Sequence, residues 1–249
     1  MFSFLDHPTP LAFAHRGGAS VHPENTMPAF QHAVDLGYRY LETDVHATSD
    51  GVLLAFHDHE LDRVTNHSGQ ISELLWDDVK HARVDGTQPI ARLDELLSSF
   101  PEARLNIDIK AQNSIRPLVD TIIAHDAIDR VCVGSFSDRR LSEVRDLMGP
   151  RLCTSLGPLG VAALRAASFG TPSAVPRVGC AQVSPMVRNR TLLDERFVAA
   201  AAEHDLPIHV WTIDDEAEMN RLLDLGVAGI MTDKPQVLKD VLVARNAWT

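Results

Sequence analysis

Acidic side chains gather near the ends of apolar runs in this chain. Glu42 and Asp44 stand two residues apart in the β-branched stretch 40–45, and Asp108 stands in "LNIDIK". Side chains two apart in a strand share a face, so Glu42 and Asp44 point the same way. A buried ionised carboxylate is costly unless it is paired or bound to a metal. Converging acids therefore predict a site for a hard divalent cation, Mg²⁺ or Ca²⁺, with ligands Glu42, Asp44 and Asp108.

Two histidines end other apolar runs. His15 closes the stretch 11–16, and His57 closes the stretch 52–57. A single histidine at a strand end is more often a packed or surface residue, but imidazole titrates near neutrality and suits a general acid and base. The pair predicts that one histidine deprotonates an attacking hydroxyl, from water or from the substrate's own vicinal hydroxyl, while the other protonates a leaving alkoxide. The sequence leaves open which histidine does which.

Basic residues accompany the acids. Arg16 follows His15, and Lys110 shares a face with Asp108. Ordinary salt bridges to Arg16, Arg39 or Lys110 are the alternative explanation of the acids. With a divalent cation and a singly charged phosphodiester, however, three carboxylates, Arg16 and Lys110 sum to zero charge. The set is suited to breaking a P–O bond, because a metal polarises the phosphoryl oxygen while the histidines move protons.

Short apolar runs alternate with helical patterns along the chain. This alternation implies βαβ units and, at 249 residues, favours an α/β fold of the TIM (β/α)8 barrel type. Nine strands are expected, whereas a barrel of this type has eight. Either the turn at 49–51 joins the second and third strands as a hairpin, or one strand lies outside the barrel. Strands are expected at 11–16, 40–45, 52–57, 105–110, 131–136, 152–156, 181–184, 208–213 and 229–232. Helices are expected at 26–36, 115–125, 139–148, 160–167, 192–204, 215–225 and 235–245.

The stretch from about 58 to 89 interrupts this rhythm. It is polar, rich in turn residues and longer than an ordinary loop between strand and helix. Loops after the strands carry the chemistry of such barrels, so an insertion there would shape access at the C-terminal mouth. We expect a single domain, 1–249, with this insertion.

Composition narrows the class of protein. The formal charge of −11 argues against binding to nucleic acid or to an anionic membrane surface. Cys132, Cys153 and Cys180 lie in or beside apolar runs, which is typical of reduced thiols in a cytosolic protein. No run resembles a signal peptide or approaches the roughly 20 residues of a membrane span. The sequence predicts a soluble, cytoplasmic protein without stable membrane insertion.

The motifs together resemble the glycerophosphodiester phosphodiesterase family, of the phospholipase-C-like TIM-barrel superfamily. The matching stretches are "AHRGGASVHPENTMPAF", "LETDVHATSDGVLLAFHDHELDRVT", "LNIDIK", "VWTI" and "GVAGIMTDKP", in family order over nearly the whole chain. The resemblance implies metal-dependent hydrolysis of glycerophosphodiesters to an alcohol and sn-glycerol 3-phosphate, in lipid and glycerol metabolism. It implies a small-molecule substrate and Mg²⁺ or Ca²⁺ as cofactor.

The resemblance also assigns roles. It implies catalysis by His15 and His57, metal binding by Glu42, Asp44 and Asp108, and phosphate contact by Arg16 and Lys110. Trp211 resembles the family's aromatic residue in the pocket, and Glu24 of "PENT" matches a motif acid with a supporting polar role or a role at the start of a helix. Two departures stand out: Asp108 occupies a place where the family commonly has Glu, and Ala228 one where it commonly has Asp.

Rival hypotheses use the same barrel. A phospholipase of C or D type, acting on lipid phosphodiesters, would want an exposed apolar or basic rim near the mouth; Leu74–Trp76 is the one apolar cluster in the insertion. A non-catalytic binding protein would be expected to lack a histidine or a metal acid, and none is missing. "HDH" at 57–59 imitates a two-histidine metal motif, but later strands supply no matching histidine, so His59 is expected in a loop. The head group, the preferred metal and the oligomeric state stay open.

Overall fold

Parallel strands curl into a barrel at the centre of the molecule. The structure is a computed structural model that describes residues 2–8 and 10–249. Within these residues the main sheet contains eight parallel strands: β1 (Leu11–Ala14), β2 (Tyr40–Ala47), β6 (Arg104–Ile109), β7 (Val131–Gly134), β8 (Cys153–Thr154), β9 (Ala181–Val183), β12 (Ile208–Val210) and β13 (Gly229–Thr232).

The strands follow the order β8-β7-β6-β2-β1-β13-β12-β9. A parallel bridge between Ser155 and Cys180 joins the two ends of this path, and the Leu156 N–H donates to the Cys180 carbonyl at 2.9 Å. The first and last strands are neighbours, with Ala14 paired to Thr232. The predicted TIM-type α/β fold is confirmed.

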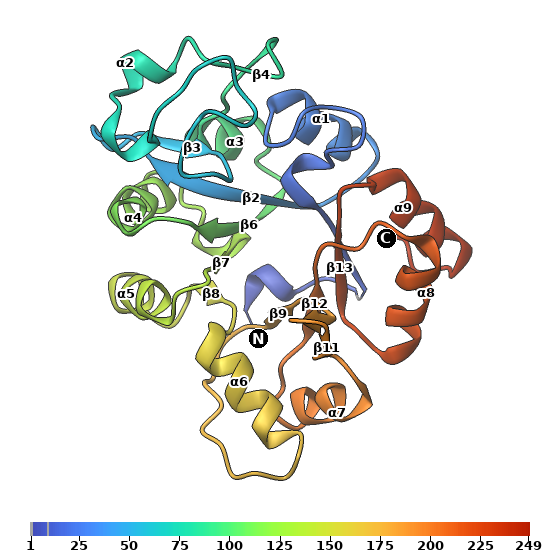
Figure 1. Cartoon of the computed structure of the whole chain (residues 1–249). Coiled ribbons are helices and arrows are strands. Elements are labelled where there is room, and N and C mark those ends of the chain that lie inside the picture. Colours follow the sequence, from blue (N-terminus) through green and yellow to red (C-terminus); the bar gives the residue numbers. More distant parts are fainter. Residues whose placement is uncertain (1, 9) are drawn as a thin grey trace.

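Helices surround the strands as an outer layer (Figure 1). They are α1 (Met27–Asp35), α3 (Leu93–Ser99), α4 (Ile115–Ala124), α5 (Asp138–Met148), α6 (Pro158–Ala167), α7 (Glu195–Glu203), α8 (Glu216–Leu225) and α9 (Pro235–Ala244). Local sequence fixes several starts: the side chains of Asp194 and Asp215 accept backbone N–H groups from the first turns of α7 and α8, each at 2.9 Å. α3 was not among the predicted helices, and the others match within a few residues except at the start of α7.

The hairpin alternative for the extra strand is correct. β3 (Leu53–Ala55) pairs antiparallel with the end of β2, so that Val45 lies opposite Ala55. The turn closes through Gly51, whose φ is 87°, and whose N–H donates to the Thr48 carbonyl at 3.0 Å. β3 therefore lies outside the ring of eight and directs the chain toward the mouth.

The segment that follows β3 forms a small cap with its own core. It contains α2 (Trp76–Val79), β4 (Arg83–Val84) and β5 (Gln88–Pro89), and it lies beside β2 and β3 (Figure 1). Its apolar side chains pack together rather than into the barrel, so the segment is ordered by its own burial. This cluster is Leu54, Phe56, Leu61, Ile71, Val79, Ala82, Val84 and Ile90.

Side chains fill the barrel interior. Phe4, from the short helix Ser3–Leu5 at the N-terminal end, packs against Phe13 and Tyr40, and its carbonyl accepts the Tyr40 hydroxyl at 2.8 Å. Cys132, Cys153 and Cys180 face the same interior as free, buried thiols. None of the described helices is long and apolar enough to cross a membrane. Remaining short elements are β10 (Met186–Val187), β11 (Arg190–Thr191) and the 3-10 turns His15–Gly17, Ile71–Glu73, Gln112–Ser114 and Ile128–Arg130.

Candidate active site

A tight turn after β1 places the first histidine and arginine. Arg16 has φ 51°, and Gly17 follows with φ 83°. A Cβ at Gly17 would lie 2.8 Å from the Ala29 Cβ and 2.9 Å from the Phe30 backbone nitrogen, so α1 approaches too closely for any side chain. The turn aims the Arg16 N–H at Glu42 Oε2, 3.0 Å away. Strained backbone of this kind is often found at functional sites.

His15 lies between two carboxylates. Its Nδ1 is 2.8 Å from Asp233 Oδ1, and its Nε2 is 3.8 Å from Glu42 Oε2. Burial lowers the pKa of His15, but the charge of Glu42 and the hydrogen bond that the ring donates to Asp233 outweigh it, so the pKa is raised above 6.5. Asp233, directly after β13, is therefore the partner that orients the His15 ring.

The three predicted metal acids lie on adjacent strands. Asp44 of β2 is in register with Asp108 of β6, and Glu42 lies two residues before Asp44 on the same face. Burial raises the pKa of Glu42 to about 7, and the charge of Asp44 adds to the effect. Burial also raises the pKa of Asp44, but Lys110 and Arg16 outweigh it and lower that pKa.

Both predicted phosphate-binding residues contact these acids. Lys110 Nζ lies 2.8 Å from Asp44 Oδ1 and 2.7 Å from Asp108 Oδ2, and Arg16 Nε lies 3.1 Å from Asp44 Oδ2. Burial lowers the pKa of Lys110, but Asp108 and Asp44 outweigh it and raise the pKa. In this arrangement Lys110 neutralises the acids, which is the salt-bridge alternative considered from the sequence.

The fit to a metal ion can be judged from the donors. Asp108 Oδ1 is buried and has no hydrogen-bond partner among the described residues, and three carboxylates provide the oxygen ligands that Mg²⁺ and Ca²⁺ favour. Across residues 2–8 and 10–249, no three His, Cys, Asp or Glu side chains are arranged to hold an ion as they stand. The donor type fits a divalent cation, and such an ion would replace Lys110 as the partner of Asp44 and Asp108.

His57 reaches the same end of the barrel from the β2–β3 side. Its Nδ1 is 2.6 Å from Asp58 Oδ1, and its charge is among the influences that lower the pKa of Asp44. Burial raises the pKa of Asp58, but hydrogen bonds from Arg63 and His57 lower it to about 2, so Asp58 is a fixed negative partner. Each predicted catalytic histidine thus has its own carboxylate, and sequence reasoning missed both carboxylates.

His46, on β2, supports the segment that carries His57. Its Nε2 donates to the His57 carbonyl at 3.2 Å, and burial lowers its pKa to about 4, so the ring is neutral near pH 7. Glu24, the motif acid, accepts a hydrogen bond from Arg16 NH1 at 3.0 Å. The structure therefore favours the supporting polar role of Glu24 over the role at the helix start, where no side-chain cap of α1 is found.

An aromatic pair borders the site on the far side. Trp211, directly after β12, meets Phe136, two residues beyond β7, edge to face at 5.6 Å between ring centroids. Lys110 Nζ lies 5.8 Å from the centre of the Phe136 ring, which connects the pair to the acids. Phe136 is 63% exposed and was not predicted. Ser135 beside it is a packed hydroxyl that donates to the Ile109 carbonyl at 2.8 Å.

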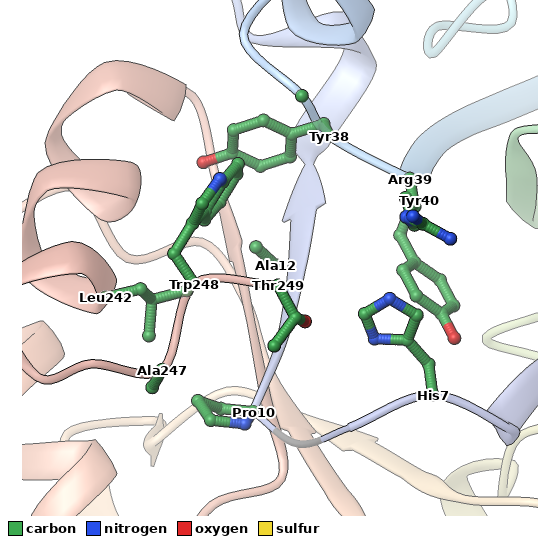
Figure 2. A pocket seen from close by; sticks show the side chains of 11 residues that line it. His7, Pro10, Ala12, Tyr38, Arg39, Tyr40, Leu242, Ala247, Trp248 and Thr249 are labelled. Carbon is green, nitrogen blue, oxygen red and sulfur yellow. The ribbon is translucent and has the colours of Figure 1, made fainter.

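A crevice at the other end of the barrel has a packing role. It lies among the residues that precede β1 and β2 and the C-terminal residues, and no predicted site residue lines it. Figure 2 shows Trp248 beside Tyr38 there, with ring centroids 5.1 Å apart. The Tyr38 hydroxyl donates to the Pro235 carbonyl at 2.7 Å, so these side chains secure the C-terminus.

Known proteins resemble this chain over most of its length. The profile of the Glycerophosphoryl diester phosphodiesterase family matches residues 15–237. The probable glycerophosphodiester phosphodiesterase 2 of Mycobacterium tuberculosis is 39% identical over 98% of this chain and 95% of the relative. Lysophospholipase D GDPD1 of Rattus norvegicus is 29% identical over 92% of this chain and 85% of the relative.

Solved structures share the fold. One described as a glycerophosphoryl diester phosphodiesterase of Silicibacter pomeroyi has a TM-score of 0.84 and 23% identity, with each chain covered in full. A phosphodiesterase of Oleispira antarctica in complex with the product sn-glycerol-3-phosphate has a TM-score of 0.80 and 20% identity, covering 94% of this chain and 97% of that one.

The family profile and the relatives, on this barrel, define a phosphoric diester hydrolase. The chain belongs to the Glycerophosphoryl diester phosphodiesterase family, and the family and enzyme class predicted from the sequence are both confirmed.

Proposed function

We propose that the protein hydrolyses glycerophosphodiesters to an alcohol and sn-glycerol 3-phosphate by acid–base catalysis between His15 and His57. The observation that carries this proposal is that each imidazole has a carboxylate on Nδ1, at 2.8 Å from Asp233 and 2.6 Å from Asp58. A carboxylate at Nδ1 holds the proton there, which leaves Nε2 to exchange protons with the substrate.

The chemistry needs one proton removed and one supplied. One imidazole takes the proton of the attacking hydroxyl as its oxygen bonds to phosphorus, and the other protonates the alcohol oxygen as the P–O bond breaks. Arg16 and Lys110 hold the phosphate, and Trp211 borders the substrate. If the attacking oxygen belongs to the glycerol 2-hydroxyl, a cyclic phosphate forms first, and water then opens it.

A divalent cation fits this proposal. Glu42, Asp44 and Asp108 would hold Mg²⁺ or Ca²⁺, which would polarise a phosphoryl oxygen when bound. Asp108 Oδ1, which has no hydrogen-bond partner within residues 2–8 and 10–249, supports the inclusion of Asp108 despite its shorter side chain. We also place the enzyme in the cytoplasm as a single domain, 1–249, with free thiols supporting that compartment.

Removal of divalent cations should abolish turnover. After chelation and desalting, glycerophosphocholine, glycerophosphoethanolamine and glycerophosphoglycerol should all remain intact, because the acids without a cation repel phosphate. Added Mg²⁺, Ca²⁺ or Mn²⁺ should restore release of the alcohol and sn-glycerol 3-phosphate, measured by a coupled dehydrogenase assay. Full activity in the chelated protein would remove the metal from the proposal, and phosphocholine as the product would show cleavage of the wrong P–O bond.

A second candidate, hydrolysis of lysophospholipids, is favoured by exposed apolar side chains at the mouth. They follow three neighbouring strands, and we call them the apolar rim: Phe136, Leu159, Met186 and Val187, which are 63%, 72%, 50% and 49% exposed. Isolated exposed apolar residues are ordinary, but a group beside a site can hold an acyl chain on the glycerol. The relative from Rattus norvegicus is named a lysophospholipase D, which agrees with this candidate.

The apolar rim should separate two substrates that release the same alcohol. For the double variant Leu159→Ser/Met186→Ser we expect kcat/KM for lysophosphatidylcholine to fall about tenfold, since each lost apolar contact is worth about 0.8 kcal/mol or more. Turnover of glycerophosphocholine should not change. Choline release measures both. Leu147→Ser, at a 43% exposed position near the C-terminal end of α5, is the matched control. Equal effects on both substrates would rule out an acyl-chain site here.

A further inference from the structure

One ionic network links the two halves of the site through the cap. Arg63, from the segment after β3, donates from Nε to Asp58 Oδ2. Its other nitrogens donate to Glu24, at 2.7 Å from NH2 to Oε1 and 3.2 Å from NH1 to Oε2. Glu24 Oε1 also accepts Arg16 NH1 at 3.0 Å. The path therefore runs from His57 through Asp58, Arg63 and Glu24 to Arg16.

We infer that Arg63 and Glu24 are positioning residues: Arg63 holds the carboxylate that orients His57, and Glu24 joins this pair to the phosphate-binding Arg16. The inference rests on the proposed function and adds two roles to it. It also explains two motif residues that the mechanism leaves unused, the Glu of "PENT" and the Arg of "DRVT".

Stability alone is a poor explanation of these contacts. The Arg63 side chain is 48% exposed, and ion pairs of exposed arginines contribute little to folding. The Arg63 guanidinium instead fixes the positions of two carboxylates, those of Asp58 and Glu24, because its planar fork binds both at once. Asp58 follows β3 by three residues and lies in a loop, so its carboxylate needs such a partner to stay on the His57 ring.

The position of Arg63 gives the cap a second purpose. The peptide around it is anchored by the Asp62 carboxylate, which accepts the Gly69 N–H at 3.0 Å, and by the Leu61 N–H, which donates to the Gly69 carbonyl at 3.1 Å. Leu61 itself belongs to the buried cluster of the cap. The folded cap thereby fixes the guanidinium against Asp58, the carboxylate on the His57 ring.

Substitution of Arg63 should lower kcat and leave KM nearly unchanged. For Arg63→Met we expect kcat for glycerophosphocholine to fall about tenfold, the size typical of losing a group that orients an active-site imidazole. KM should change by less than twofold, and the melting temperature should stay close to that of the parent. Arg63→Lys should recover part of kcat. Glu24→Gln should lower kcat and also raise KM, because it releases Arg16 as well.

A double variant separates positioning from a general structural effect. If Arg63 acts through Asp58, Asp58→Asn/Arg63→Met should be no slower than Asp58→Asn alone, because residues acting as one unit are not additive. Arg151→Met is the matched control: it breaks another arginine–carboxylate pair, with Asp129, on the exposed surface, and should leave kcat unchanged. An unchanged kcat in Arg63→Met, or multiplicative losses in the double variant, would overturn the inference.

The proposed function can fail independently of this inference. Parent-like turnover in His57→Ala would remove the acid–base role itself, whatever Arg63 does. A strong loss in His57→Ala together with full activity in Arg63→Met would reject only the positioning role.

Discussion

Replacing His15 or His57 by alanine should reduce kcat for glycerophosphocholine by a factor of about 10² to 10⁴, the range that general acid–base catalysis contributes. Both rings have their Nδ1 held by a carboxylate, and both side chains reach the surface, at 14% exposed for His15 and 36% for His57, so the substitutions remove proton transfer without opening a closed cavity. Steady-state kinetics in the presence of Mg²⁺ measure the loss. Circular dichroism should show the same melting temperature as the parent within a few degrees.

The motif "HDH" provides its own control for this experiment. His59 lies two residues after His57, and its side chain is 73% exposed. Its nearest charged neighbour is Glu60 at 3.8 Å, away from the acids at the mouth. His59→Ala should therefore turn over at the parent rate. Parent-like activity in His15→Ala or in His57→Ala would remove that residue from the acid–base pair.

Acidification should destabilise the fold through His209 in the barrel interior. Burial lowers the pKa of His209 to about 3, whereas an unfolded histidine titrates near 6.5. Between these values the unfolded chain binds a proton that the folded protein does not, so the free energy of unfolding falls as the pH decreases through this window. The full difference amounts to about 5 kcal/mol, of which about 2 kcal/mol is lost by pH 5.

Substitution of His209 isolates this contribution. Among the described residues both ring nitrogens lack a hydrogen-bond partner, and the ring packs 4.9 Å from that of Phe13. His209→Leu, of similar size, should stabilise the protein by about 1 to 3 kcal/mol at pH 7, because buried polar atoms without partners are costly. The gain should grow to roughly 3 to 5 kcal/mol at pH 5, as the buried imidazole no longer titrates.

Urea denaturation at both pH values measures the two differences. His81→Leu is the matched control at an exposed position of the cap, and its curves should coincide with those of the parent. A difference between parent and His209→Leu that stays constant from pH 7 to pH 5 would contradict the proposed titration.

Much of the fold was predictable because the barrel is built from repeated local units. Apolar runs of strand length alternate with helices whose starts have Asp or Pro, and these signals need no long-range information. α3 was missed because it has only seven residues and follows the irregular cap, although Leu93, Leu96 and Leu97 carry the spacing of a buried helix face. The hairpin of β2 and β3 was one of two alternatives that the sequence left open, and the choice between them needed coordinates.

The partners of the histidines were harder to predict for two different reasons. Asp58 is adjacent to His57, and neighbours in a strand point to opposite faces. They meet because β3 ends at Ala55 and both residues lie in the following loop. The distance between His15 and Asp233 is 218 residues along the chain, so only the closure of the barrel brings them together. Likewise, the alternation of side chains along a strand predicted that Glu42 and Asp44 share a face. The register between β2 and β6, which places Lys110 between Asp44 and Asp108, needed coordinates.

The contact between His15 and Asp233 also has a consequence for biosynthesis. During translation, His15, Arg16 and all three acids leave the ribosome well before the codon for Asp233 is read. No nascent chain can hold the His15 ring in place until β13 has been made and has entered between β1 and β12. With the role proposed for His15, catalytic capacity therefore arises only after Asp233 has been made, and products that terminate before this residue contribute none.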